Sequence, residues 1–255
     1  MDKSQTVSPQ VTPKCCGSLT MEADILVTGE SGTIEAPSIV YLIDADEVIL
    51  VDTSFGNPEL MAERHPEFRC HRTTDQQLES AIQSEGYACS DIDSVVFTHL
   101  DWDHCYNLSL FDEDTKFYIQ RQELAYAISP YPIHAARYEA KSLGLTPPWL
   151  SYDLVPLDGE TQLCDGVVAF PTPGHTVGHQ SLAVTSPAGT TIVAGDAIPT
   201  FQNISDDTDT PQRCGLAMNE IQWWESANEI LTRGSKILPG HEWDIVEADA
   251  AGRFD

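Results

Sequence analysis

The 255-residue sequence predicts an α/β protein in which two β-sheets form a sandwich with helices on its outer faces. Short β-like runs occur in two groups, one in each half of the chain, and helical patterns lie between and after them. No low-complexity linker separates the halves. We therefore expect one domain over residues 21–255, preceded by a flexible arm over residues 1–20.

The first half contains several short apolar runs bounded by polar and glycine-rich turns. Such runs predict strands over residues 23–29, 38–44, 47–53 and 94–99. A helix is predicted over residues 75–86, because this segment begins with an Asp that can cap it and ends in Gly.

The second half repeats this pattern. Strands are predicted over residues 116–120, 166–172, 180–186, 190–195 and 236–241. A helix is predicted over residues 216–232, and residues 121–145 look helical but are interrupted by the sequence SPYPI.

Charge and cysteine content exclude some classes of protein. The net charge is −27, with 40 acidic against 13 basic residues, so nucleic acid and anionic membranes are unsuitable partners. The acidity fits either an ordinary solubilising surface or a high-salt cytoplasm. No apolar run approaches the roughly 20 residues that cross a bilayer, and the N-terminus lacks the apolar core of a secretion signal. Seven cysteines without a CxxC spacing predict reduced thiols in a cytoplasmic protein.

Potential metal ligands are concentrated in the stretch THLDWDHCYN, directly after the predicted strand over 94–99. It contains His99, Asp101, Asp103 and His104. A loop at a strand end is a place where side chains can converge on a ligand.

Three further strand ends carry the same chemistry. TPGHTVGH contains His175 and His179, VAGDA contains Asp196, and LPGHE contains His241. A single strand-end histidine is usually structural, but several that recur with carboxylates indicate a metal site. Imidazole and carboxylate together suit divalent zinc, iron or manganese.

These stretches, together with VILVDTSFG and QRQELAYA, resemble the metallo-β-lactamase fold superfamily, whose signature is HxHxDH followed by distant His, Asp and His. Within it, the chain is most similar to the N-acyl-homoserine lactonase group. The resemblance spans roughly residues 37–245 and implies a four-layer αββα sandwich.

The resemblance also implies a ligand set for two divalent metal ions, with zinc as the first choice. It assigns His99, Asp101 and His175 to one ion and Asp103, His104 and His241 to the other, with Asp196 bridging both. Asp52 would hold a ligand in place by hydrogen bonds, although a turn-forming role is equally compatible with LVDTS. His179 would support the ligands or serve the packing.

The sequence departs from the family pattern at two positions. Asp101 replaces the second His of HxHxDH, and its negative charge should favour iron or manganese relative to zinc. Pro199 stands where these lactonases carry a tyrosine near the substrate carbonyl. Tyr106, Tyr131, Tyr138 and Trp149 are candidates to border the pocket instead.

The predicted function is metal-dependent hydrolysis of a small lactone or similar ester by a metal-bridging hydroxide, with Asp103 accepting and returning the proton. The segment over 129–150 could form a lid, an acyl-binding wall or a packing arm. The alternative is a di-iron oxidoreductase, because the superfamily's flavodiiron branch also has a carboxylate at the position of Asp101. A non-catalytic metal-binding protein is the third reading. Assembly of several copies is compatible with the sequence.

Overall fold

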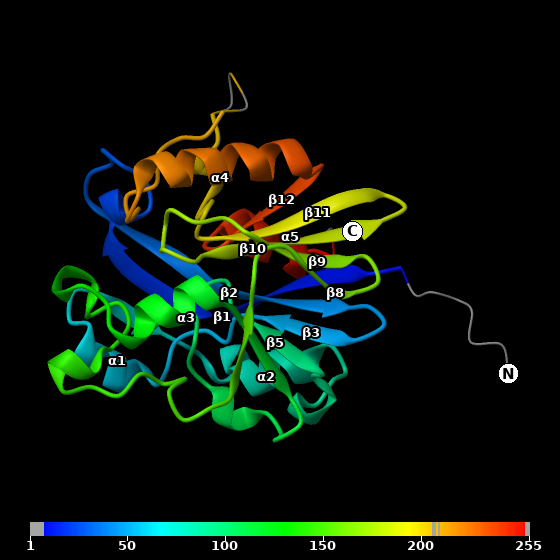
Figure 1. Cartoon of the computed structure of the whole chain (residues 1–255), viewed down its shortest axis with the longest axis horizontal. Helices are drawn as coiled ribbons and strands as arrows, with labels where there is room; N and C mark the ends of the chain where they lie inside the picture. The colour runs from blue at the N-terminus through cyan, green and yellow to red at the C-terminus, as the bar shows by residue number, and fades with distance from the viewer. Residues whose placement is uncertain (1–7, 206–207, 209, 253–255) are drawn as a thin grey trace, which may run out of the picture.

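The computed structural model describes residues 8–205, 208 and 210–252. Two β-sheets lie face to face, and helices cover their outer sides (Figure 1). The larger sheet has the strand order β4 (Arg69–His71), β1 (Gln10–Glu22), β2 (Thr33–Asp44), β3 (Val48–Val51), β5 (Ser94–Val96), β6 (Lys116–Gln120) and β7 (Leu154–Leu157). The smaller sheet has the order β12 (Lys236–Pro239), β11 (Gly189–Gly195), β10 (Gln180–Ser186), β9 (Val167–Pro171) and β8 (Thr161–Cys164).

Alternation along β5 shows how the layers are built. Val96 packs between the two sheets with β3 and β10 residues such as Val51 and Leu182. Its neighbours Val95 and Phe97 point to the opposite face, where they meet the helical layer. Both faces of this strand are therefore buried, which explains its continuous apolar sequence.

The helices complete the four layers. Helix α2 (Leu78–Ser84) packs Leu78 and Ile82 against the larger sheet. Helix α4 (Glu220–Arg233), the long helix at the top of Figure 1, packs Trp223 and Ile230 against the smaller one. The other α-helices are α1 (Pro58–Arg64), α3 (Arg121–Ile128) and α5 (Trp243–Ala250). The predicted αββα sandwich is confirmed.

The expectation of a flexible arm over residues 1–20 is wrong from Gln10 onward. Residues 10–22 form β1, which pairs with β2 from Gln10–Asp44 to Glu22–Thr33. Pro13 argued against a strand, yet it lies in the part of β1 that pairs with β2 alone, and such an edge position tolerates proline. Residues 1–7 lie outside the described part of the chain.

The predicted strand over residues 23–29 is also wrong. Ala23–Ile25 form a single 3-10 turn, closed by a 3.1 Å bond from the Leu26 amide to the Ala23 carbonyl. Ile25 and Leu26 of this segment line a pocket described below. By contrast, the strands predicted over 116–120 and 180–186 match β6 and β10 at both ends.

Prolines decide the structure of residues 121–145. Helix α3 ends at Ile128, just before the SPYPI sequence, and the rest of the segment contains only two short 3-10 turns, Pro132–His134 and Lys141–Leu143. No helix among the described residues is long and apolar enough to cross a membrane.

Candidate metal centre

The ends of parallel strands bring the predicted ligands together. Strand β3 is parallel to β5, and β11 is parallel to β12, so their carboxyl ends meet along one edge of the sandwich. His99 follows β5, Asp196 directly follows β11, and His241 follows β12. His175 comes from the loop between β9 and β10.

Backbone carbonyls orient two of the imidazoles. His175 Nδ1 donates to the Leu216 carbonyl at 2.6 Å, and His241 Nδ1 donates to the Pro37 carbonyl at 2.8 Å. Nδ1 is the donor in each ring, so Nε2 is the atom that each ring directs at the centre.

Asp52 orients a third imidazole. One of its oxygens lies 2.8 Å from His104 Nδ1, and both oxygens accept hydrogen bonds from Thr98, one from the amide and one from the hydroxyl. The Thr98 hydroxyl in turn lies 2.9 Å from His99 Nδ1. Asp52 has a φ of +61°, a left-handed conformation that Asp and Asn adopt more readily than most residues.

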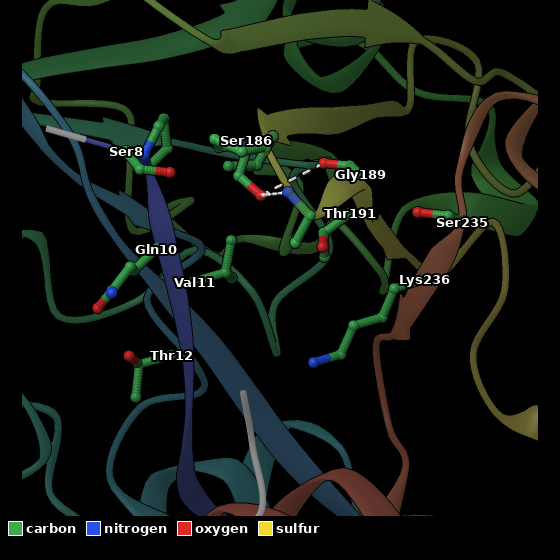
Figure 2. A pocket seen from close by; sticks show the side chains of 13 residues that line it. Ser8, Gln10, Val11, Thr12, Ser186, Gly189, Thr191, Ser235 and Lys236 are labelled. Carbon is green, nitrogen blue, oxygen red and sulfur yellow. Dashed lines mark hydrogen bonds between the residues drawn. The ribbon is translucent and has the colours of Figure 1, made fainter. Parts of the chain in front are cut away.

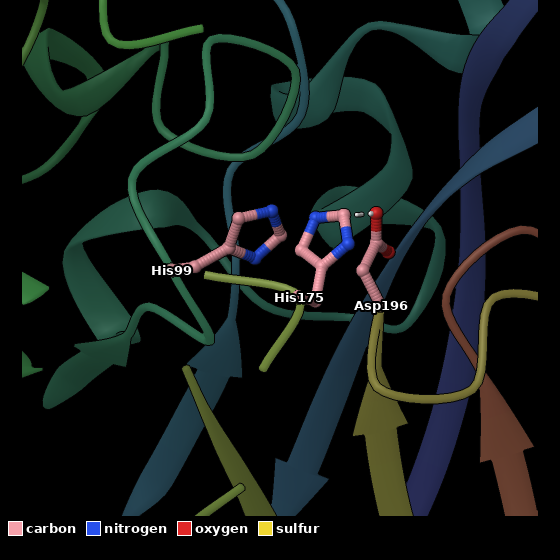
Figure 3. A group of neighbouring side chains, drawn as sticks. All are labelled: His99, His175 and Asp196. Atoms are coloured by element: carbon pink, nitrogen blue, oxygen red, sulfur yellow. Dashed lines mark ion pairs between the residues drawn. The ribbon is translucent and has the colours of Figure 1, made fainter. Parts of the chain in front are cut away.

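The ligand atoms form two groups, each with its atoms within 4.8 Å of one another. The first ligand group is His99, His175 and Asp196, shown in Figure 3. The second ligand group is Asp103, His104 and His241. Asp196 also approaches the second group, with Oδ1 lying 3.2 Å from His241 Nε2 and 3.6 Å from His104 Nε2.

Among the described residues, three of these atoms are buried without a hydrogen-bond partner: His99 Nε2, His104 Nε2 and Asp196 Oδ1. Buried polar atoms are normally paired, and leaving one unpaired costs about 1–3 kcal/mol. Nitrogen and carboxylate donors that face one another without protein partners fit a divalent metal ion.

Protonation of the imidazoles reflects the surrounding carboxylates. Burial alone would lower the pKa of His104, but Asp196, Asp103 and Asp52 raise it well above its ordinary value. His241 has a raised pKa for the same reason, with Asp196 as the main partner against burial. Burial would raise the pKa of Asp196, but His241 and His104 hold it well below its usual range.

Asp101 points into the centre, but its carboxylate is already paired with Arg137. Its Oδ2 lies 3.4 Å from both His99 Nε2 and His175 Nε2. The Arg137 guanidinium grips the carboxylate, with Nη2 at 2.5 Å from Oδ2 and Nε at 3.1 and 2.9 Å from the two oxygens. Although burial would raise the pKa of Asp101, Arg137 and the imidazoles hold it well below its usual range.

Arg137 was not predicted as a site residue. It is one of only 13 basic residues in 255 and lies in the 129–150 segment, for which a lid, an acyl-binding wall and a packing arm were all open. Arg137 Nη2 also lies 2.9 Å from His175 Nε2. No local pattern in the sequence relates Arg137 to Asp101, which lies 36 residues earlier.

His179 supports the centre without facing it. Its Nδ1 lies 2.8 Å from the Thr172 hydroxyl, and its Nε2 accepts the backbone N–H of Asp196 at 3.2 Å. The latter bond requires an unprotonated Nε2. Burial and the neighbouring imidazoles of His99 and His175 accordingly lower the pKa of His179 well below its usual value.

Glu123 is a second buried support, and the sequence analysis gave it no role. This fully buried carboxylate accepts hydrogen bonds from the amide of Leu100 at 3.1 Å and of Gly178 at 2.9 Å, and from the Tyr138 hydroxyl at 3.1 Å. It therefore ties together the HxDxDH loop, the loop between β9 and β10, and the 129–150 segment.

A pocket opens onto the two ligand groups. Its floor includes Asp101, Asp103, His175, Asp196 and His241. Its apolar wall consists of Met21, Ile25, Leu26, Phe68, Trp102 and Leu216.

The candidates for the missing tyrosine do not line this pocket. Tyr138 and Trp149 are buried elsewhere, and Tyr131 is 71% exposed. Pro199 does line it, and so does His65, which stacks on Trp102 with ring centroids 4.1 Å apart.

A wider depression lies at the opposite end of β11 and β12 (Figure 2). It is bordered by the start of β1, the β10–β11 turn and Lys236. Its described lining contains no imidazole, thiol or carboxylate. The chemistry gathered at strand ends is therefore at the other depression.

Residues 34–241 match the sequence profile of the metallo-β-lactamase superfamily. The chain belongs to this superfamily. Among curated members, an N-acyl homoserine lactonase of Bacillus thuringiensis is 28% identical over 185 residues, covering 68% of this chain and 69% of the relative. A probable metallo-hydrolase of Mycobacterium tuberculosis is 31% identical over 180 residues, covering 62% and 56%.

Solved structures of the metallo-β-lactamase superfamily share the fold. The lactonase AiiA of B. thuringiensis, with N-decanoyl-L-homoserine at its active site, superposes with a TM-score of 0.75 at 21% identity, covering 96% of this chain and 97% of the other. The dizinc quorum-quenching lactonase AidC has a TM-score of 0.69 at 15% identity, covering 94% and 90%. The predicted resemblance and the predicted kind of protein, a metal-dependent hydrolase, are confirmed.

Proposed function

We propose that this protein hydrolyses a lactone or a similar small ester that carries an apolar acyl group. The observation that supports this most is the set of buried, unpartnered ligand atoms, His99 Nε2, His104 Nε2 and Asp196 Oδ1, at the floor of a pocket with an apolar wall. The relatives whose names include N-acyl homoserine lactonase agree with this substrate class.

The two ligand groups would hold two divalent ions, with Asp196 shared between them. Imidazole and carboxylate donors suit zinc, and iron or manganese are the alternatives. Such ions would polarise the substrate carbonyl and lower the pKa of a water molecule. Because Arg137 offsets the charge of Asp101, the argument that Asp101 favours iron or manganese loses weight, and we propose zinc first.

An aspartate of this chain, Asp103, would transfer the proton during hydrolysis. Asp103 lies at the pocket floor, its side chain 16% exposed, with Oδ2 at 3.8 Å from His104 Nε2. We assign it to accept the proton of the attacking water and return it to the ring oxygen. The new C–O bond forms to water, the ester C–O bond breaks, and the leaving alkoxide becomes a hydroxyl.

The apolar wall would bind the acyl part. Met21, Ile25 and Leu26 come from the end of β1 and the turn after it, and Trp102 comes from the metal motif itself. Burying an apolar chain against such side chains contributes about 25 cal/mol per Å² of area removed from water. Of the 129–150 segment, Ala136 and Arg137 line the pocket, so this segment supplies a polar edge rather than the acyl wall.

The di-iron oxidoreductase reading depended on Asp101 as an extra carboxylate ligand. Because both oxygens of Asp101 accept bonds from Arg137, that reading loses its main argument. The third reading, a non-catalytic metal-binding protein, required a broken site, and the two complete ligand groups speak against it.

Seven free cysteines support a reducing compartment, and we place the enzyme in the cytoplasm.

The test combines metal removal with two variants. Chelation should abolish hydrolysis of acyl lactones and esters, and added zinc should restore it. His104→Ala and His241→Ala should each lose bound metal and reduce turnover to background, whereas His71→Ala, outside both groups, should retain both. Hydrolysis that survives chelation, or no hydrolysis of any lactone, ester or thioester by zinc-loaded protein, would refute the proposal.

A further inference from the structure

We infer that Arg137 acts as a built-in cation at the first ligand group, so that the protein binds its two metal ions in two unequal steps. The second ligand group takes the tight ion, and the first group takes an ion only after the guanidinium withdraws. This inference rests on the proposed metal-dependent function, but its test reads metal binding rather than hydrolysis.

Arg137 occupies the lone pair of His175 Nε2. Because His175 Nδ1 donates to the Leu216 carbonyl at 2.6 Å, Nε2 is the unprotonated acceptor. Arg137 Nη2 is a donor only, and it lies 2.9 Å from that atom. The guanidinium therefore uses the same lone pair that a metal ion would need. His99 Nε2 and His104 Nε2, by contrast, have no hydrogen-bond partner within the described ranges of the chain.

The Arg137 guanidinium also places a positive charge beside the first ligand group. The Arg137 side chain is 16% exposed and Asp101 is 8% exposed, so the pair is largely shielded from water. A divalent ion at the first ligand group would meet the positive end of this ion pair, because the guanidinium contacts one of the ligands. Either the ion binds against that repulsion or Arg137 leaves Asp101, and breaking a buried pair is costly.

Hydrogen bonds anchor the backbone and the residues around Arg137. Its carbonyl accepts the Trp102 amide at 2.9 Å, next to the metal motif. The following residue, Tyr138, is buried and donates to Glu123. Glu139 is fully buried and accepts bonds from Arg64, His65 and Tyr106. The guanidinium is thus held at the centre by an anchored segment rather than by a mobile surface loop.

In the described part of the chain, no arginine lies at the ligand atoms of the second ligand group. His104 Nε2 has no hydrogen-bond partner among the described residues, while its Nδ1 bonds to the Asp52 carboxylate. His241 Nδ1 donates to the Pro37 carbonyl. Asp103 adds a carboxylate that is partly exposed to the pocket. Among the described residues no arginine contacts these donors, so this group should bind first once its imidazoles have released their protons.

The experiment is an equilibrium titration of metal-free full-length protein with Zn²⁺ against a chromophoric chelator, with bound zinc counted by elemental analysis. Wild type should bind one equivalent tightly and a second at least tenfold more weakly. Arg137→Gln should strengthen the second step at least tenfold and leave the first within about threefold. Arg137→Lys, which keeps the charge, should retain a weak second step. Arg121→Gln removes a surface arginine that pairs with Asp158 and should match wild type.

The possible outcomes test the role of Arg137 separately from the proposed function. Two equal tight equivalents in wild type, or an unchanged second step in Arg137→Gln, would overturn the role of Arg137 while leaving the proposed hydrolase intact. No tight zinc in wild type would instead refute the proposed function. If Arg137→Gln folds poorly without metal, the wild-type stoichiometry and Arg137→Lys still decide. A second readout is the melting temperature, whose rise between one and two equivalents of zinc should be larger in Arg137→Gln than in wild type.

Discussion

The two ligand groups of this centre contain similar donors but are supported differently. The second group is fixed from behind: Asp52 and the Pro37 carbonyl hold the Nδ1 atoms of His104 and His241 and leave their inner faces free. The first group is also held from behind, at His175 by the Leu216 carbonyl, but Arg137 reaches its inner face. We therefore expect that ligand identity alone would not fix how strongly each group binds a metal. What else contacts the ligand lone pairs matters as much.

Asp101 has a different role in this comparison from the one that its position in the motif implies. As a lone carboxylate it would add a negative charge to the metals. Paired with Arg137, it forms a nearly neutral unit whose positive end touches His175. The chemistry of Asp101 is thus better described for the Asp101–Arg137 pair than for the carboxylate alone.

The largest expected effect is on stability. Asp101→Ala leaves the Arg137 guanidinium without its carboxylate in a largely shielded site, and removal of one partner of such a pair should cost about 3 kcal/mol of unfolding free energy. Denaturant unfolding of the metal-free protein measures this. The matched control is Asp158→Ala, which breaks the pair with Arg121 at the exposed surface and should change stability little. Equal small losses in both variants would mean that Arg137 is well solvated and does not depend on Asp101.

The next effect concerns the second ligand group. Asp52→Asn keeps the size of the side chain and suits the left-handed backbone, but it replaces one acceptor oxygen by a donor. His104 Nδ1 or Thr98 then loses its partner, and zinc affinity of the tight step should fall about 10- to 100-fold, as is typical of groups that orient metal ligands. Zinc competition titration checks it, with the exposed Asp46→Asn as a control for the loss of one charge. An unchanged affinity would reduce Asp52 to a turn former.

Much of the fold and of the ligand set was accessible from local sequence. Period-two and continuous apolar patterns located β6 and β10 correctly because each is a short run bounded by turn residues. Strand β1 was missed because its stability comes from pairing with β2, not from its own composition, which includes Pro13 and Gly17. The ligand positions followed from strand ends, where parallel strands deliver side chains to one edge.

The contacts of Arg137 and Glu123 could not be predicted in the same way. Arg137 lies 36 residues after Asp101 in a segment without regular secondary structure, so no periodicity relates the two. Glu123 lies on α3 and would be expected on a solvated helix face, yet it is fully buried and satisfied by two backbone amides from different loops. Both depend on long-range contacts that only the folded chain creates.

The smallest effect is a dependence on pH that should differ in sign between the metal-free and the zinc-loaded protein. In the metal-free state, Asp196 and its neighbouring carboxylates raise the pKa of His104 and His241 above that of an unfolded histidine, despite burial. Between about pH 6.5 and 8 the folded chain then holds protons that the unfolded chain has released, so stability falls as pH rises, by at most about 1.4 kcal/mol per pH unit for each imidazole. Zinc needs the unprotonated imidazoles, so its stabilisation should grow over the same range. Melting temperatures of both forms across this window measure the two slopes, and His241→Gln should flatten the metal-free one. A metal-free slope of the same sign as the zinc-loaded slope would mean that these imidazoles are neutral in the folded protein and that the carboxylates around the second ligand group are screened by water.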